Sequence, residues 1–498
     1  MIPLKFRKIT AALLALIIML SGALCACSGE ETPDVTTDES TDVDPSTLSG
    51  STLMLPYSRT DSFNPYEAET TQNVQIMSLL HYGLYSVSDS YAVTPRLAKG
   101  ANVGKTTVNV TISSSAVFSD GSVVTADDVV ESFNLAKQSK AYSERLSGVT
   151  SAVKSTATTV MFALSQPDPY VLACLDFPIV RIIEGKEFPL GCGRYVASRT
   201  ADDEIYLNIN PKCTGFKSII TFIKLVSVNE NSAKGSLEIG KLSFVFDDLS
   251  GGSYTNVNAK SKGATLNNFV YLGINKDSYA LSEQTFRRAV NLMINRNEVV
   301  FTAFQGHAEI AYSPFNPQWY EVKTKDLTVF QNLPTAQNLI DESGKGYDNV
   351  LNLIVNKENP FKLETAQVIK KQLESAGLKV KIQAVELTDY KWMIENGEYD
   401  LYVGEVRLCT NMSLYPFFGG SLGYGIDTAG VAATAYYSFM SDEINIVDFV
   451  DAFNTDVPFI PLCYRKGAAL STNSLYSGKT FTDCDIYANI GSWGFTGK

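Results

Sequence analysis

The stretch Thr106–Ala136 restricts the fold most, because it places a strand, a tight turn and a helix start in direct succession. From Val108 to Ile112 every second residue is apolar, which is the pattern of a strand with one buried face. A Phe-Ser-Asp-Gly turn follows, in which Gly121 is free to adopt a positive φ. Thr125 then precedes an aspartate by three residues, an acidic variant of the capping box. The stretch predicts an α/β protein.

Composition excludes several functional classes. The chain has 498 residues, enough for two or three domains, and its 45% hydrophobic content is typical of a globular protein. The net charge of −12 argues against nucleic-acid binding, which needs positive side chains to neutralise phosphates. Only His81 and His307 are present, so a histidine-rich metal site is excluded and a catalytic triad would need one of them. His81 follows a helical run and is expected to pack or cap. We expect no enzyme, no metal and no cofactor.

Residues 1–27 have the pattern of an export signal rather than of folded structure. Basic residues lie near the start, and the apolar run Ala11–Leu20 is too short for a convincing membrane span. The segment ends in Leu24-Cys25-Ala26-Cys27, which is similar to a bacterial lipobox. We therefore predict a signal peptide whose Cys27 becomes the acylated first residue of a lipoprotein. The alternative is an ordinary signal peptide.

Residues 28–50 are predicted to tether the folded part to this anchor. The stretch is acidic, rich in Thr and Ser, and nearly free of large apolar side chains. Such a composition cannot bury enough surface to offset the entropy of ordering. Folded sequence is predicted to begin at Ser51, with a first strand at Leu53–Leu55.

Further elements follow from local patterns. The expected elements are a helix at Thr71–Leu80, a hairpin with strands at Val196 and Ile205–Ile209, a strand at Phe222–Leu225, a strand at Leu351–Val355, a helix at Lys362–Ala376 and a strand from Leu378 to Ile382. The last three form a βαβ unit, so their strands should be parallel with a right-handed crossover. Gly377 is expected at the C′ position of the unit's helix.

Several segments resemble extracellular solute-binding proteins of the oligopeptide, dipeptide and nickel ABC-importer family, family 5. The strongest match is Phe118–Phe133, FSDGSVVTADDVVESF, which resembles the family's F-S-D-G followed by T-A-x-D-V-x-x-S. Other matches, in the family's order, are Asn64-Pro65, Gly83-Leu84, Pro95–Ala98, Gly191–Tyr195, Phe269–Asn275, Phe286–Val300 and Asp456–Leu462. Together they extend from about Leu53 to Leu462.

The resemblance implies a two-lobed, type II periplasmic-binding-protein-like α/β fold with an additional domain inserted in the first lobe. The predicted division is signal peptide 1–27, tether 28–50, lobe I 51–85, inserted domain 86–188, lobe I 189–266, lobe II 267–445 and lobe I 446–498. Proteins of this kind close their two lobes over a ligand.

Two loops are the candidate ligand-binding site. The first follows the first strand, and the second follows the strand after Trp392; their candidate residues are Tyr57, Ser58, Arg59 and Asn64, and Glu405, Arg407, Cys409 and Asn411. In the resembling peptide receptors an Asp of the second region holds the ligand's α-amino group by a charge-assisted contact. Here Glu405 stands in place of the family's Trp, and Leu408 or Cys409 stands near the Asp position.

This departure leaves three interpretations open. Glu405 supplies the carboxylate from a different position, or Glu405 and Arg407 pair with each other on the surface, or the natural ligand has no free amino terminus. A buried, unpaired ammonium would cost several kcal/mol.

Six cysteines remain after Cys27, and outside the cytoplasm they could form disulfides. Fifteen connectivities are available to six cysteines. Cys192 and Cys213 flank the predicted hairpin and are a candidate bridge.

The resemblance implies a monomeric, lipid-anchored receptor on the outer face of the bacterial cytoplasmic membrane. Such a receptor hands a peptide or a similar small solute to an ABC permease. One alternative is a receptor for a non-peptide ligand: an oligosaccharide, a metal chelate or a signalling molecule. The other is a secreted hydrolase, against which the two histidines and the lack of a paired-acid motif both argue.

Overall fold

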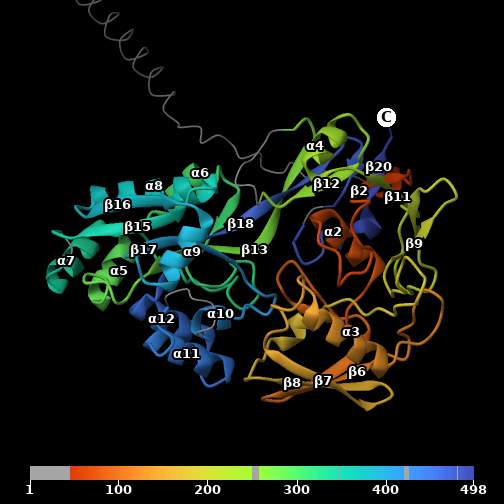
Figure 1. Cartoon of the computed structure of the whole chain (residues 1–498), viewed down its shortest axis with the longest axis horizontal. Coiled ribbons are helices and arrows are strands. Elements are labelled where there is room, and N and C mark those ends of the chain that lie inside the picture. The colour runs from red at the N-terminus through yellow and green to blue at the C-terminus, as the bar shows by residue number, and fades with distance from the viewer. Residues whose placement is uncertain (1–44, 250–256, 346, 420–425, 479–480, 498) are drawn as a thin grey trace, which may run out of the picture. The chain divides into compact units, whose positions relative to one another are not determined.

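The computed structural model describes residues 45–249, 257–345, 347–419, 426–478 and 481–497 (Figure 1). The predicted targeting segment 1–27, with Cys27, and most of the predicted tether lie outside these residues. After a short 3₁₀ turn, Pro45–Thr47, strand β1 (Leu48–Ser49) pairs with β20 (Gly494–Thr496), which also pairs with β19 (Leu475–Tyr476). Regular structure therefore begins before Ser51, because the C-terminal strand provides a partner.

A four-stranded sheet, called the first sheet, has the order β2-β11-β10-β9. Its strands are β2 (Leu53–Tyr57), β9 (Tyr195–Arg199), β10 (Ile205–Ile209) and β11 (Phe222–Ser227). The predicted hairpin is confirmed as β9 and β10, and β2 pairs with β11 in parallel. The apolar alternation in β2 buries Leu53 and Leu55 completely against helix α2 (Thr71–Leu80) and a core that includes Trp493.

A second four-stranded sheet, which belongs to the predicted inserted domain, has the order β5-β6-β8-β7 and its own hydrophobic core. Its elements are β5 (Ala98–Val103), β6 (Thr107–Ile112), β7 (Val149–Thr156), β8 (Thr159–Leu164) and helix α3 (Ala126–Gln138), with the strand pair β3 (Tyr85–Val87) and β4 (Val93–Pro95) and the 3₁₀ helix η2 (Val171–Cys174) beside them in the chain. The alternation in β6 buries its apolar residues as predicted. Gly121 has φ +91°, and Thr125 and Asp128 form the predicted capping box at the start of α3.

The large sheet has the order β12-β18-β13-β17-β15-β16, and β14 pairs with β18. Its strands are β12 (Phe244–Asp247), β13 (Lys260–Ile274), β14 (Ala308–Ile310), β15 (Val350–Asn356), β16 (Lys379–Val385), β17 (Leu401–Arg407) and β18 (Phe459–Ser471). The predicted βαβ unit is confirmed: β15 and β16 are parallel, helix α8 (Pro360–Ser375) connects them, and Gly377 after it has φ +95°.

Strands β13 and β18 extend far beyond the other strands of the large sheet. The first part of β13, from Lys260, pairs with the end of β18, and its last part pairs with the start of β18. β12 lies beside the end of β18, whereas β17 pairs with β13 only from Asn268 onward. Two long antiparallel strands therefore connect the region next to the first sheet with the β17-β15-β16 region, as Figure 1 shows.

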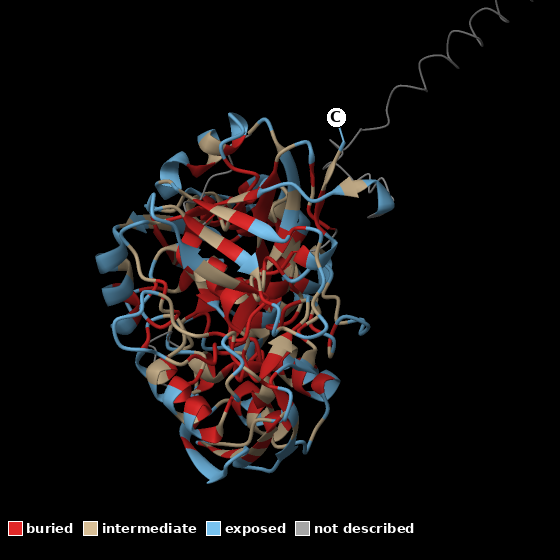
Figure 2. Ribbon diagram, turned by 90° about the vertical axis from the view of Figure 1, so that its right-hand side faces the viewer, coloured by how far each residue is buried: buried red, intermediate tan, exposed pale blue. Residues whose placement is uncertain are grey.

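Helices cover the large sheet. They are α4 (Glu230–Glu238), α5 (Gln284–Met293), α6 (Arg296–Ala303), α7 (Leu333–Ser343), α9 (Leu387–Glu395), α10 (Tyr415–Phe418), α11 (Val431–Met440) and α12 (Ile446–Asp456). Figure 2 shows that the buried residues run through the interior while the exposed ones lie on the outside. In the part of the chain that is described, no helix is long and apolar enough to cross a membrane.

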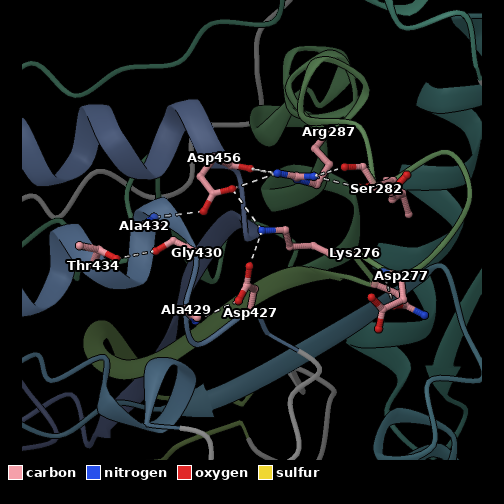
Figure 3. A network of polar contacts seen from close by, with 12 residues as sticks. Lys276, Asp277, Ser282, Arg287, Asp427, Ala429, Gly430, Ala432, Thr434 and Asp456 are labelled. Carbon is pink, nitrogen blue, oxygen red and sulfur yellow. Dashed lines mark hydrogen bonds and ion pairs between the residues drawn. The ribbon is translucent and has the colours of Figure 1, made fainter.

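The carboxylate of Asp456, at the end of helix α12, contacts the neighbouring helices (Figure 3). Asp456 accepts a hydrogen bond from Arg287 of α5 at 2.9 Å and one from the backbone N–H of Ala432 in α11 at 3.0 Å. Lys276 Nζ lies 2.8 Å from Asp427 and 3.4 Å from Asp456. The network connects α5, α11 and α12.

The expected bridge between Cys192 and Cys213 is wrong. All six cysteines of the described residues are free. The ladder between β9 and β10 ends at the pair Tyr195 and Ile209, so the two cysteines lie beyond it and are not cross-strand neighbours. Cys213 Sγ instead lies 3.8 Å from the hydroxyl of Tyr82.

Candidate ligand-binding site

The loop that follows β17 is fixed by a buried amide from the neighbouring strand. Asn267 of β13 donates from Nδ2 to the carbonyl oxygens of Leu408 at 2.9 Å and Cys409 at 3.0 Å. The Asn267 amide oxygen in turn accepts from Asn316 at 3.1 Å. Because buried polar groups need partners, this arrangement holds the chain where it leaves the sheet.

This loop meets two other segments, and we call the meeting point the three-segment junction: Asp168–Asp176 of the inserted domain, Leu408–Ser413 after β17, and Asp483–Cys484 near the C-terminus. The Thr410 hydroxyl donates to the carbonyl of Ala173 at 2.7 Å, and Asn411 Nδ2 donates to Asp168 Oδ2 at 2.7 Å. Arg407 lies 2.9 Å from Asp483. The junction thus brings together residues that are far apart in the sequence.

The carboxylates of the junction have different partners. Asp176 forms an ion pair with Arg145, and Asp483 pairs with Arg407. Within the part of the chain that the structure describes, Asp168 accepts from neutral donors alone, the Asn411 amide and the backbone N–H of Tyr170 at 2.9 Å. Burial raises the pKa of the Asp168 carboxyl to about 6, and these two hydrogen bonds offset only part of that effect.

Aromatic side chains surround Tyr170, which lies two residues after Asp168. The ring of Tyr170 meets Trp319 edge to face at 4.9 Å between centroids and Phe439 at 5.9 Å. Trp319 is buried, whereas Tyr170 stays partly exposed. The junction therefore has a carboxylate and a partly exposed aromatic ring close together in the chain, two kinds of group that sites for small ligands use.

The cysteines of the junction are not anions. Burial raises the pKa of the Cys409 thiol to about 12 and moves those of Cys174 and Cys484 well above the usual value. A neutral thiol is neither a nucleophile nor a counter-ion for an ammonium group. Cys409, near the family's Asp position, therefore does not replace that Asp in charge.

Glu405 lies on β17 but is already paired. Arg465 Nε lies 2.6 Å from its carboxylate, and Lys362 Nζ lies 3.1 Å away. Asn268 donates a third contact at 3.0 Å. Burial alone would raise the Glu405 pKa, but these cations outweigh it and lower the pKa to about 2. The predicted pair of Glu405 with Arg407 is wrong, because each has a partner on a different strand or segment.

The candidate residues of the loop after β2 contact the elements around the first sheet. Tyr57 is buried against Phe63, and the backbone N–H of Ser58 donates to Asn73 at 2.8 Å. Arg59 is exposed and pairs with Asp203. The side chain of Asn64 accepts from the backbone of Tyr66 at 3.1 Å, in a local turn. The contacts of these four residues lie around the first sheet. The other four candidates make their contacts on the large sheet or at the three-segment junction; they are Glu405, Arg407, Cys409 and Asn411.

Sequence reasoning missed Asp168, although a signal was present. The residue stands between Pro167 and Pro169, and proline restricts both its own φ and the residue before it. An acidic residue held in such a restricted backbone deserves consideration as a site residue. Its partner Asn411 was a candidate, but only the fold shows that the two meet.

His81, one of the two histidines, packs as expected. It follows α2 as the C-cap residue and is 4% exposed. Burial lowers its pKa to about 3, so the ring stays neutral.

Comparison with known proteins identifies the family. Residues 92–417 match the model of the bacterial extracellular solute-binding proteins, family 5 Middle. The chain belongs to this family. It is 23% identical over 545 residues to the oligopeptide-binding protein AppA of Bacillus subtilis (strain 168), covering 98% of this chain and 99% of AppA. It is also 23% identical over 353 residues to the nickel-binding protein NikA of Staphylococcus aureus (strain NCTC 8325 / PS 47), covering 67% of this chain and 69% of NikA.

A solved structure supports the same conclusion for the fold. The unliganded open form of the periplasmic murein tripeptide binding protein MppA has a TM-score of 0.73 at 16% identity, covering 90% of this chain and 98% of MppA. The predicted two-lobed periplasmic-binding-protein fold is confirmed. The protein is an extracellular solute-binding protein of an ABC importer, and therefore a binding protein rather than an enzyme.

Proposed function

We propose that this protein is a lipid-anchored receptor that captures a peptide or a similar small solute and delivers it to an ABC permease. Family membership supports the transport role. The lipobox at Leu24–Cys27 and the acidic stretch after it support the anchor. In this proposal residues 1–26 direct export, and the acylated Cys27 then keeps the receptor on the outer face of the cytoplasmic membrane, where it acts as a monomer.

The observation that carries the proposal is the three-segment junction. Polar groups of the inserted domain meet the loop after β17 there, while the two long strands β13 and β18 connect the two sides elsewhere. Two regions that are joined by continuous strands at one place, and that touch through a few polar contacts at another, can hinge about the strands. Opening at the junction admits the solute, and closing surrounds it.

Peptides are the preferred class of solute. AppA, which aligns over nearly the whole chain, is described as an oligopeptide-binding protein. NikA is described as nickel-binding, but the described residues hold no group of three or more His, Cys, Asp or Glu side chains suited to a metal ion. A bare metal ion is therefore disfavoured. A non-peptide solute such as an oligosaccharide or a metal chelate is the alternative, and the lack of a carboxylate near the family's Asp position, where Leu408 or Cys409 stands, favours it.

Native mass spectrometry of protein purified from its source tests the proposal. We expect the protein to carry excess masses that fragment into peptide sequences under collisional activation. Protein from which the solute was removed by partial unfolding and refolding serves as the control and should show the bare mass. Excess masses that fragment as sugars or as metal complexes would replace the peptide assignment by the alternative.

A further inference from the structure

Asp168 is the exception among the carboxylates of the three-segment junction. Asp176 and Asp483 are each paired with an arginine, so their charge is compensated. No cationic side chain of the described residues forms an ion pair with Asp168. A carboxylate that is largely removed from water without a cation is costly, so its presence here calls for a partner beyond those that the described residues supply.

The geometry of Asp168 leaves room for such a partner. An ionised carboxylate has about four lone-pair positions for hydrogen bonds. Asn411 and the backbone N–H of Tyr170 each occupy one of them. Asn411, which is 6% exposed, holds the Asp168 carboxylate from the protein side, whereas residue Asp168 as a whole is only half-buried.

The other groups near the loop after β17 cannot take a cation. Glu405 is neutralised by Arg465 and Lys362, and Arg407 is itself positive. Cys409 is a neutral thiol and Asn411 carries no charge. Glu144, whose backbone carbonyl lies near Cys409, is exposed, so water already solvates its carboxylate.

We propose that Asp168 of the inserted domain binds the primary ammonium group of the ligand, so that the ligand's charge is met from the side opposite the loop after β17. The proposal rests on the proposed receptor function and specifies its ligand class: a peptide with a free amino terminus. Asn411 acts as a positioning residue, because its amide fixes the Asp168 carboxylate without contributing charge. Tyr170, with Trp319 and Phe439 behind it, gives the adjoining part of the ligand an apolar surface.

The test uses the whole protein, emptied of its solute, and two peptide pools. One is a casein hydrolysate with free amino termini, and the other is the same hydrolysate after acetylation of its amines. Native mass spectrometry of the protein with each pool measures which peptides are retained. Titration calorimetry with a retained peptide and its N-acetyl form then measures affinity. We expect the free peptide to bind and acetylation to weaken binding by at least about 30-fold.

Asp168→Asn removes the charge but keeps an oxygen that can accept from Asn411. We expect it to weaken the free peptide by at least about 30-fold and to leave the already weak acetylated peptide unchanged. Glu144→Gln is the matched control, since it removes an exposed carboxylate of the same domain, and it should bind like the parent. A thermal denaturation midpoint at or above that of the parent shows that the Asp168 variant is folded.

Three results would show which hypothesis fails: the peptide-receptor function, the role of the ligand's ammonium group, or the role of Asp168. Parent protein that retains nothing from either pool contradicts the peptide function itself. Parent protein that binds free and acetylated peptides equally contradicts the role of the ammonium group, without any variant. A folded Asp168→Asn protein that binds the free peptide as the parent does contradicts the role of Asp168 while leaving the receptor function intact.

Discussion

Glu405 illustrates how little a residue's sequence neighbours say about its partners. Val406 and Arg407 follow it along β17, so Arg407 is the nearest cationic residue in the sequence. In the fold its carboxylate meets Lys362 from α8 and Arg465 from β18, which lie 43 and 60 positions away in the chain. Both cations are largely buried, so the three charges stabilise one another inside the protein rather than on its surface.

The Glu405 charge should make stability depend on pH. Its pKa is lowered from 4.5 to about 2, so the ionised form contributes about 3 kcal/mol to the free energy of unfolding. This contribution is present above pH 4.5 and is lost as the pH falls toward 2. Glu405→Gln should therefore lower the free energy of unfolding by about 3 kcal/mol at pH 7, and the difference from the parent should shrink near pH 3.

Urea denaturation at pH 7 and pH 3 measures this difference. Glu374→Gln, which removes the exposed pair with Lys370 on α8, is the control and should change the free energy by less than about 0.5 kcal/mol. Equal stability of the parent and Glu405→Gln at pH 7 would show that the paired charges only balance their own desolvation.

The candidate site was predictable residue by residue only in part. Asn411 could be named as a candidate because its side chain is polar. The missing family Asp near Cys409 could be seen because the surrounding motif is local in the sequence. Asp168 lies 243 positions from Asn411, and no local periodicity connects them. A site assembled from three distant segments requires the tertiary fold, since spacing in sequence carries no information about which loops meet.

At the level of elements, local patterns predicted the compact units and missed the long ones. The capped helix α3 and the βαβ unit of β15, α8 and β16 follow from periodicity and caps within a short window. The segment Phe269–Asn275, which matches the family, covers only the last part of β13, a strand that begins at Lys260. Its first residues, Lys-Ser-Lys-Gly, have no apolar alternation, so pairing with β18 rather than propensity makes them a strand.

Helix α12 gives an element-scale prediction. Its last residue, Asp456, is 4% exposed, and its negative charge neutralises the positive charge of Arg287, which is 3% exposed. Removing one partner leaves a buried charge uncompensated, so Asp456→Asn should lower the free energy of unfolding by about 3–5 kcal/mol. Because the same carboxylate binds the backbone at the start of α11, amide hydrogen exchange in α11 and α12 should accelerate more than in α8.

Hydrogen exchange measured by mass spectrometry, together with urea denaturation, checks this expectation. Asp451→Asn changes an exposed carboxylate on the same helix and should leave both measurements within about 0.5 kcal/mol of the parent. Exchange that accelerates uniformly over the large sheet would show that Asp456 stabilises the whole core rather than the attachment of α11 and α12.

For the whole molecule, the question is what holds this acidic protein at a membrane. Removal of the predicted signal peptide would take away Lys5, Arg7 and Lys8 and bring the net charge from −12 to −15. Anionic lipid surfaces attract polybasic segments and repel such a protein. No helix of the described residues could span a bilayer. The anchor that we propose is therefore an acyl modification of Cys27, the residue that the lipobox pattern selects.

The chain between Cys27 and β1, roughly 20 residues, reaches at most about 70 Å when fully extended, so acylation of Cys27 as proposed would keep β1 within that distance of the membrane. Cys27→Ala should release the protein from the membrane fraction, because two or more acyl chains supply most of the affinity. Cys25→Ala is the matched control, since it changes the neighbouring cysteine of the same motif, and it should remain bound. Immunoblots of separated fractions, with intact masses that verify removal of residues 1–26, measure the outcome. A Cys27→Ala protein that has lost its signal peptide and still sediments with the membrane would place the anchor elsewhere in the chain.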